Sequence, residues 1–76
     1  MKEKIVSQTT GLEYCPSDVV RIVNYKQAAS YMAHGATLLD IYASRNFEDN
    51  TPLLVFIFNR SDTREMYDLW CKHELK

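Results

Sequence analysis

The segment LLVFIFNRSD, residues 53–62, constrains the fold of this chain more than any other. Its first six residues are all apolar and rich in β-branched and aromatic side chains, which predicts a strand over residues 53–59. Successive side chains of a strand point to opposite faces of its sheet, so this strand is apolar on both faces. In a chain of only 76 residues, both faces of the sheet must therefore find a cover.

The remaining elements follow from the periodicity of the sequence. The β-branched residues of DVVRIV predict a strand over residues 19–23, and the alternation in TLLDIYAS predicts another over residues 37–44. Apolar residues recur at helical spacing after the first and after the third predicted strand along the chain, which predicts helices over residues 25–34 and 62–74. The order is β-α-β-β-α. We therefore expect an α+β domain with two helices on one face of a mainly antiparallel three-stranded sheet.

Capping residues mark the ends of both predicted helices. Asn24, with a glutamine three residues later, is the expected N-cap of the first helix. Asp62 is the expected N-cap of the second, with Ser61 as an alternative one residue earlier. Gly35 stands where a left-handed residue commonly ends a helix.

The two faces of the sheet divide the apolar residues into two sets. We expect the helices to cover the aliphatic set Leu39, Ile41, Val55 and Ile57. The other face then carries Leu38, Tyr42, Leu54, Phe56 and Phe58. Such a contiguous apolar patch is unusual on a monomer, so we expect it to be covered as well.

Two coverings of that second face are open. Residues 1–18 form either an N-terminal arm or a short extra strand, and this arm could fold over the sheet. Alternatively a second copy or a foreign partner docks there, and the small size of the single domain, residues 19–76, favours a homodimer.

Charge and composition exclude several classes of protein. The net charge is −1 and the pI is about 6.0, which disfavours generic electrostatic binding to nucleic acid or to anionic lipid. No apolar run approaches the length of a membrane span. The charged N-terminus lacks the apolar core of a signal peptide. Cys15 and Cys71 are too few for a disulfide-rich secreted domain, so we expect reduced thiols and a cytoplasmic protein.

Metal and catalytic chemistry find little support in the sequence. The soft ligands are Cys15, His34, Cys71 and His73. Cys71 and His73 lie two residues apart on a predicted helix, so their side chains point away from each other. This spacing opposes both a zinc site and a cysteine–histidine pair. We therefore expect no metal, no cofactor and no enzymatic activity.

Surface residues suggest binding instead. Glu48 and Asp49 lie in a hairpin loop, where an acidic tip could contact a basic surface. Arg60 and Arg64 lie at the start of the second helix, where N–H groups and arginine favour an anion, although Asp62 competes for that position. The aromatic residues Tyr42, Phe56 and Phe58 complete the candidate binding residues.

A resemblance to a known family rests on the segments AASYMAHGATLLDIY and LVFIFNRSDTREMYDLW. Together they resemble a group of short bacterial and phage proteins of unassigned function, over roughly residues 19–72. The matching positions are Ala28, Ala29, Gly35, Leu38, Leu39, Phe56, Phe58, Tyr67 and Trp70. The chain departs from the pattern in its N-terminal extension and its longer loop at residues 46–52. The resemblance implies an origin in phages or mobile elements and transfers no site residues.

The sequence thus predicts a small non-enzymatic binding protein that docks on a host protein, for example as an inhibitor of a host defence system. One alternative is a nucleic-acid-binding accessory or regulatory protein that uses Arg60 and Arg64. Aspartate and glutamate residues on the same helix oppose that alternative, since they cancel its field. Another alternative is a protein that sequesters a small anionic nucleotide between two copies.

Overall fold

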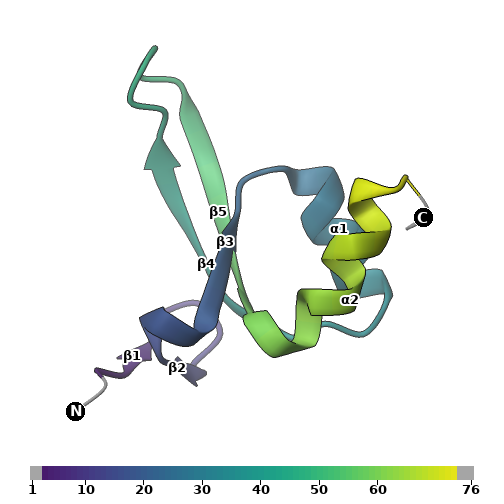
Figure 1. The fold of residues 1–76 in the computed structure, drawn as a ribbon. Coiled ribbons are helices and arrows are strands. Elements are labelled where there is room, and N and C mark those ends of the chain that lie inside the picture. The colour runs from purple at the N-terminus through teal and green to yellow at the C-terminus, as the bar shows by residue number, and fades with distance from the viewer. Residues whose placement is uncertain (1–2, 74–76) are drawn as a thin grey trace.

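The computed structural model describes residues 3–73 of the chain. The elements in chain order are β1 (Ile5–Val6), β2 (Glu13–Tyr14), a short 3₁₀ helix (Pro16–Asp18), β3 (Val19–Ile22), α1 (Tyr25–Ala33), β4 (Leu38–Arg45), β5 (Pro52–Asn59) and α2 (Arg60–Cys71) (Figure 1). The strands and helices expected from residue 19 onward are confirmed. The last residue expected in the second helix, residue 74, lies outside the described residues.

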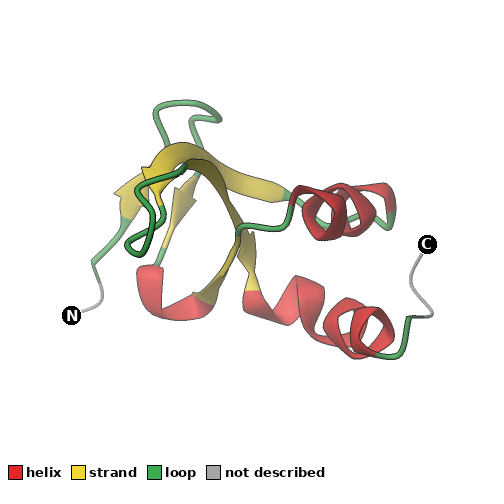
Figure 2. Ribbon diagram, turned by 90° about the horizontal axis from the view of Figure 1, so that it is seen from above, coloured by secondary structure: helices red, strands yellow, loops and turns green. Residues whose placement is uncertain are grey.

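The main sheet has three antiparallel strands in the order β3-β5-β4, so the apolar strand β5 is central. The strands β1 and β2 form a separate two-stranded antiparallel hairpin in the N-terminal arm. Both helices lie on the same side of the main sheet, as the view from above shows (Figure 2). The expected α+β class, with two helices on one face of a mainly antiparallel sheet, is confirmed.

The central strand presents its aromatic side chains to the helices. Phe56 and Phe58 are buried against Ala28 and Tyr31 of α1, and the rings of Tyr31 and Phe58 meet edge to face at 5.6 Å between centroids. The prediction that Val55 and Ile57 face the helices is therefore wrong. Alanine on the helix face leaves space above the sheet, and large rings fill that space better than aliphatic side chains do.

A β-bulge in β4 changes which residues share a face. Leu38 pairs with Phe58 but Asp40 pairs with Ile57, so one extra residue of β4 lies between these two pairs. A bulge of this kind shifts the alternation of the strand by one residue. Leu38 and Ile41 consequently pack on the helix side, whereas Leu39 packs with Ile57 on the opposite face. The expectation that Leu39 and Ile41 share a face is therefore wrong.

The N-terminal arm covers part of the second face of the sheet. Val19, Val55 and Ile57 form a small core there, and Tyr14 of the arm packs against it. The apolar residues Ile5 and Val6 contribute less, since 40% and 57% of their surfaces are exposed. The expected patch of Phe56 and Phe58 does not exist on this face, so it gives no reason for a second copy to dock there.

The helix ends explain where the chain turns. Asn24 caps α1 as expected, because its Oδ1 accepts hydrogen bonds from the backbone N–H groups of Lys26 and Gln27. At the other end, the positive-φ residue Gly35 donates its N–H to the carbonyl of Met32. Gly35 thus ends α1 by the expected left-handed cap.

The second helix starts earlier than expected. Its N-cap is Asn59, whose Oδ1 accepts from both the N–H and the hydroxyl of Ser61. The prediction that Asp62 caps this helix is therefore wrong. Strand β5 passes directly into α2 without a loop, so the first residue able to cap the helix is the last residue of the strand.

Candidate functional site

The tip of the β4–β5 hairpin carries the most exposed of the large apolar residues in the described part of the chain. Phe47 has a relative exposure of 105%, against 68% for Tyr25, the next most exposed. The hairpin projects away from the helices and the N-terminal arm, and Phe47 lies in the loop at its end (Figure 1). An aromatic side chain in this position is available to a partner without any rearrangement of the core.

The tip is ordered by its own hydrogen bonds. The N–H of Asn46 donates to the carbonyl of Thr51 over 2.9 Å, and the N–H of Asn50 donates to the carbonyl of Asn46 over 2.8 Å. The side chain of Asn46 accepts from the N–H of Glu48, and that of Asp49 accepts from the N–H of Thr51. These Asx turns fix the path of the loop and hence the position of Phe47.

Two carboxylates follow Phe47 directly. Glu48 and Asp49 are both exposed, as expected for an acidic hairpin tip. The hydroxyl and the N–H of Thr51 stabilise the Asp49 carboxylate, which lowers the pKa of that group below its ordinary value. Asp49 is therefore ionised at neutral pH. The tip presents an apolar ring beside negative charge.

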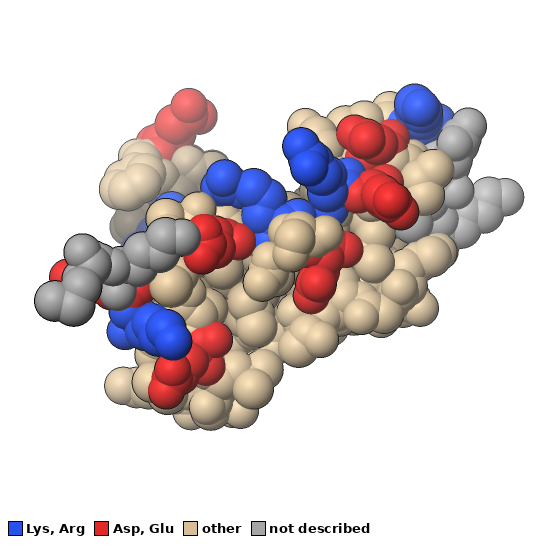
Figure 3. Space-filling view, turned by 60° about the horizontal axis from the view of Figure 1, so that its bottom comes forward, with Lys and Arg blue, Asp and Glu red and all other residues tan. Residues whose placement is uncertain are grey.

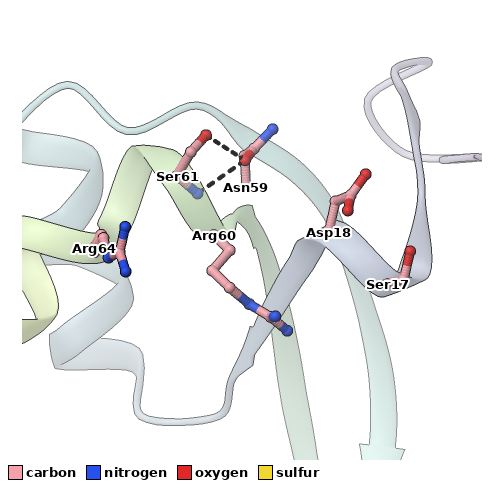
Figure 4. Close-up of a pocket in the computed structure, with 6 residues that line it drawn as sticks. All are labelled: Ser17, Asp18, Asn59, Arg60, Ser61 and Arg64. Atoms are coloured by element: carbon pink, nitrogen blue, oxygen red, sulfur yellow. Dashed lines mark hydrogen bonds between the residues drawn. The ribbon is translucent and has the colours of Figure 1, made fainter.

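A second candidate surface surrounds the start of α2. A cavity of about 500 Å³ is lined by Ser17, Asp18, Asn59, Arg60, Ser61 and Arg64 (Figure 4). The two arginines of the predicted anion site do lie at this cavity. They share it, however, with the side chain of the N-cap Asn59, which already accepts from the N–H and the hydroxyl of Ser61, and with the carboxylate of Asp18.

The orientation of the two arginines differs. Arg60 extends toward β3, where its Nη2 donates to the carbonyl of Val19 over 3.3 Å, while Arg64 lies one turn further along α2 (Figure 4). The guanidinium groups therefore do not converge on one point in the cavity. Because Asp18 and Asn59 also bring oxygens to its wall, the chemistry of this cavity opposes a small anion such as a nucleotide phosphate.

The aromatic candidates are separated by the sheet. Phe56 is 8% exposed and Phe58 is fully buried under the helices, so neither lies at the surface as expected. Tyr42 lies on the opposite face, in a shallow cavity that it shares with Ile5 and Tyr14 of the arm. The structure thus brings together Glu48 with Asp49, and Arg60 with Arg64, but does not unite the predicted binding residues into one site.

Asp40 is a buried carboxylate held by three donors. Its Oδ1 accepts from the hydroxyl of Ser7 over 2.6 Å and from the N–H of Ile41 over 2.8 Å, and its Oδ2 accepts from the hydroxyl of Tyr14 over 2.7 Å. Burial raises the pKa of Asp40, but these hydrogen bonds outweigh it, so the pKa lies below its ordinary value.

The same cluster raises the pKa of the Tyr14 phenol. Burial and the hydrogen bond to Asp40 raise the pKa of Tyr14 to about 12. The Ser7 hydroxyl also accepts from the N–H groups of Thr9 and Thr10, so it is committed to the turn of the arm. Ser7 and Asp40 thus join the arm to β4 through a buried hydrogen bond, in a cluster whose donors are all engaged.

Residues 3–73 show neither a metal-binding cluster nor a membrane-spanning helix. This part of the chain contains no group of three or more histidine, cysteine, aspartate or glutamate side chains placed to hold a metal ion. Cys15 and Cys71 are free thiols. No helix in the same range is long and apolar enough to cross a membrane.

Comparisons with known proteins do not add an identity. No family model matches the chain, and neither a curated protein nor a solved structure matches it. The resemblance to short bacterial and phage proteins therefore stays a prediction.

Phe47 was not among the binding residues predicted from the sequence. The residue stands in the loop segment NFEDN, where every neighbour is polar. A lone aromatic side chain within a hairpin loop has no core to enter, since loops run over the surface. This mismatch between residue type and position was the available signal.

Proposed function

We propose that this protein is a non-enzymatic binding protein that docks on another protein through the tip of the β4–β5 hairpin. The observation that carries the proposal is the complete exposure of Phe47 on a loop ordered by its own hydrogen bonds. A preformed loop loses little conformational freedom on binding, so burial of the ring contributes almost fully to affinity. Aromatic anchors of this kind are typical centres of protein interfaces.

The tip also defines the chemistry of its partner. Phe47 requires an apolar pocket, and the adjacent Glu48 and Asp49 favour basic residues around that pocket. Charges at the edge of an interface act mainly on the rate of association and on the choice of partner. The partner is therefore a protein surface with an apolar pocket bordered by lysine or arginine.

The origin and setting of this interaction come from the sequence. We propose a cytoplasmic protein of a phage or mobile element whose target is a host protein, and inhibition of a host defence protein is one concrete form of this function. The resemblance described above is the support for this origin.

Self-association is a second element of the proposal. An apolar groove of about 470 Å³ runs beside the hairpin and is lined by Val23, Tyr25, Ala43, Pro52, Leu53, Leu54 and Phe56. Val23, Tyr25 and Leu54 are each at least half exposed there. A homodimer would use this groove, and light scattering on wild type and Leu54→Asp tests it: loss of a dimer in the variant is the expected result.

The docking proposal is tested by affinity capture from a lysate of the source organism. Wild type, Phe47→Ala and Leu69→Ala are immobilised in parallel. Leu69 is the control because it is also an exposed large apolar residue but lies on α2, outside both the groove beside the hairpin and the groove between β3 and α2. Burial of a phenylalanine contributes about 1.5–3 kcal/mol, so Phe47→Ala should lower the affinity for the specific partner roughly 10- to 100-fold.

The pattern of capture decides the result. A protein retained by wild type and Leu69→Ala, but lost with Phe47→Ala and bound more weakly by Glu48→Lys, supports docking through the tip. Identical sets of captured proteins on wild type and Phe47→Ala contradict it.

A further inference from the structure

The two outer edges of the main sheet differ. The edge strand β4 is shielded by the arm, because the hydroxyl of Thr10 donates to the carbonyl of Leu39 over 2.6 Å and that of Thr9 donates to the carbonyl of Ile41 over 3.2 Å. The opposite edge strand, β3, pairs only with β5 within the described residues. Proteins commonly shield such edges, so an open edge beside a shaped groove indicates a use for it.

The polar groups at the open edge can be placed from the strand pattern. The carbonyl of Val19 accepts from Nη2 of Arg60 of α2 over 3.3 Å, on the side of β3 away from β5. The register with β4 implies the same side, because Ile41 turns its carbonyl out to the arm and its partner Phe56 therefore bonds to Ile22 of β3. In a strand, the peptide groups of residues two apart point to the same side. The N–H and carbonyl of Arg21 therefore share the outer side with Val19, where an incoming strand can bind them.

A groove of about 480 Å³ adjoins this edge, between β3 and α2. Its lining residues are Val20, Arg21, Ile22, Tyr31, Arg60, Thr63, Arg64, Tyr67 and Asp68. The buried ring of Tyr31 and the side chains of Val20 and Ile22 make it apolar on the sheet side. The exposed ring of Tyr67 makes the helix side aromatic.

The charge of the groove is predominantly positive. The guanidinium groups of Arg60 and Arg64 line it, against the single carboxylate of Asp68. Arg21 also borders the groove, but its side chain lies on the face of the sheet opposite to Val20 and Ile22. The space-filling view shows basic side chains gathered around a hollow in one face of the molecule, with acidic side chains to either side (Figure 3). This distribution selects an acidic ligand even though the net charge of the chain is −1.

We propose that this groove binds an extended acidic peptide segment of a partner protein, which pairs as an additional strand with β3. Main-chain hydrogen bonds to Arg21 hold the peptide, and its alternate side chains enter the apolar space between β3 and Tyr67. Acidic side chains of the peptide bind Arg60 and Arg64. A strand fits better than a helix because the groove has a free strand edge as one wall.

This inference is independent of the docking role proposed for the hairpin. Phe47 lies at the far end of the β4–β5 hairpin and does not line the groove. The Phe47→Ala variant therefore separates the two proposals. It should weaken docking through the tip while it leaves peptide binding in the groove unchanged.

The peptide itself provides the first test. A fluorescein-labelled peptide of alternating glutamate and valine is titrated with the full chain by fluorescence anisotropy, next to the same peptide with lysine for glutamate. Two further analogues carry N-methyl groups on alternate sets of peptide nitrogens. Only one set faces β3, so one analogue should bind about fivefold to tenfold more weakly and the other should bind normally, since a hydrogen bond contributes about 1 kcal/mol.

Variants of the chain provide the second test. Arg21→Pro removes the N–H of the edge, whereas Arg21→Ala removes only the charged side chain, and proline is tolerated on edge strands. Arg21→Pro should lower affinity about fivefold relative to Arg21→Ala. Arg64→Glu should lower affinity about threefold to tenfold, while Arg45→Glu, an equal change of charge on the hairpin, should have no effect. Circular dichroism verifies that each variant is folded.

Several outcomes would overturn the inference. Equal binding of both N-methylated analogues would exclude strand pairing, and equal binding of the lysine peptide would exclude the acidic preference. Absence of binding by the acidic peptide at millimolar concentration would exclude the site. A peptide-free dimer of wild type that Arg21→Pro converts to monomer would assign the edge to a second copy of this chain.

Discussion

The hydroxyl of Ser7 donates a 2.6 Å hydrogen bond to the carboxylate of Asp40 across 33 positions of sequence. This bond joins the N-terminal arm to the bulged strand β4, and both residues are buried. Together with the bonds of Tyr14, Thr9 and Thr10 to β4, it holds the two-stranded hairpin of the arm against the sheet.

Replacement of Asp40 should therefore destabilise the whole fold. Asp40→Ala leaves the Ser7 hydroxyl, the Tyr14 hydroxyl and the N–H of Ile41 without their acceptor, so we expect a loss of about 3 kcal/mol in the free energy of unfolding. Urea denaturation measures the loss. Glu48→Ala, which removes an exposed carboxylate, should leave the urea midpoint unchanged. Equal midpoints for wild type and Asp40→Ala would show that the arm does not stabilise the sheet.

The raised pKa of Tyr14 makes stability fall at alkaline pH. The folded chain holds this proton more tightly than the unfolded chain does, because the pKa rises from 10.0 to about 12 on folding. The contribution of Tyr14 to stability is thus complete below pH 10.0 and is lost as the pH rises toward about 12. Thermal melts across this range should show a decline that Tyr14→Phe reduces and that Tyr25→Phe, at an exposed tyrosine, leaves intact.

The buried and exposed phenylalanines should respond in opposite ways. Phe58 is fully buried against Tyr31, so Phe58→Ala should cost about 3–5 kcal/mol of folding free energy through lost contacts and a cavity. Phe47→Ala should leave the unfolding midpoint within experimental error, because its ring touches no core. Guanidinium denaturation compares them. Destabilisation by Phe47→Ala would mean that the tip packs on the protein itself.

Removal of the arm should expose the second face of the sheet. Deletion of residues 1–14 uncovers Leu39 and Ile57 together with the carbonyls that Thr9 and Thr10 occupy. We expect this truncated chain to aggregate, since an uncovered apolar face and a free strand edge both favour association. Light scattering detects the aggregates, and a chain that lacks only residues 1–3 is the control. A monodisperse truncated chain would contradict the role of the arm.

The sequence predicted the elements of the fold better than their orientation. The strand over residues 53–59 and the Asn24 cap were predictable, because each depends on local propensity and capping chemistry. The face of β5 toward the helices was not predictable from alternation, since both sets of side chains are apolar. The bulge before Asp40 also led to a wrong assignment of faces in β4, because one extra residue reverses the alternation of the strand. No proline or glycine in the sequence indicates this bulge.

The candidate site shows a similar division. The acidic loop at Glu48 and Asp49 was predicted as an exposed tip, and the structure places it there. The exposure of Phe47 depends on how far the hairpin projects from the rest of the protein, which no local pattern specifies. The groove beside β3 depends on the packing of α2 against a strand 41 positions away from Arg60, as its bond to Val19 shows. Contacts over such separations are set by the tertiary fold.

The hydroxyls of Thr9 and Thr10, which bond to carbonyls of β4, also limit how copies of this chain can associate. Two chains that joined their β3 edges would form one continuous six-stranded sheet, whose outermost strands would both be β4. Each of those strands has carbonyls already bound by Thr9 and Thr10 of its own arm. Growth by edge pairing would therefore stop at two chains. The arm thus leaves one open edge per chain, so edge pairing can join two copies of this chain but cannot extend into a longer sheet.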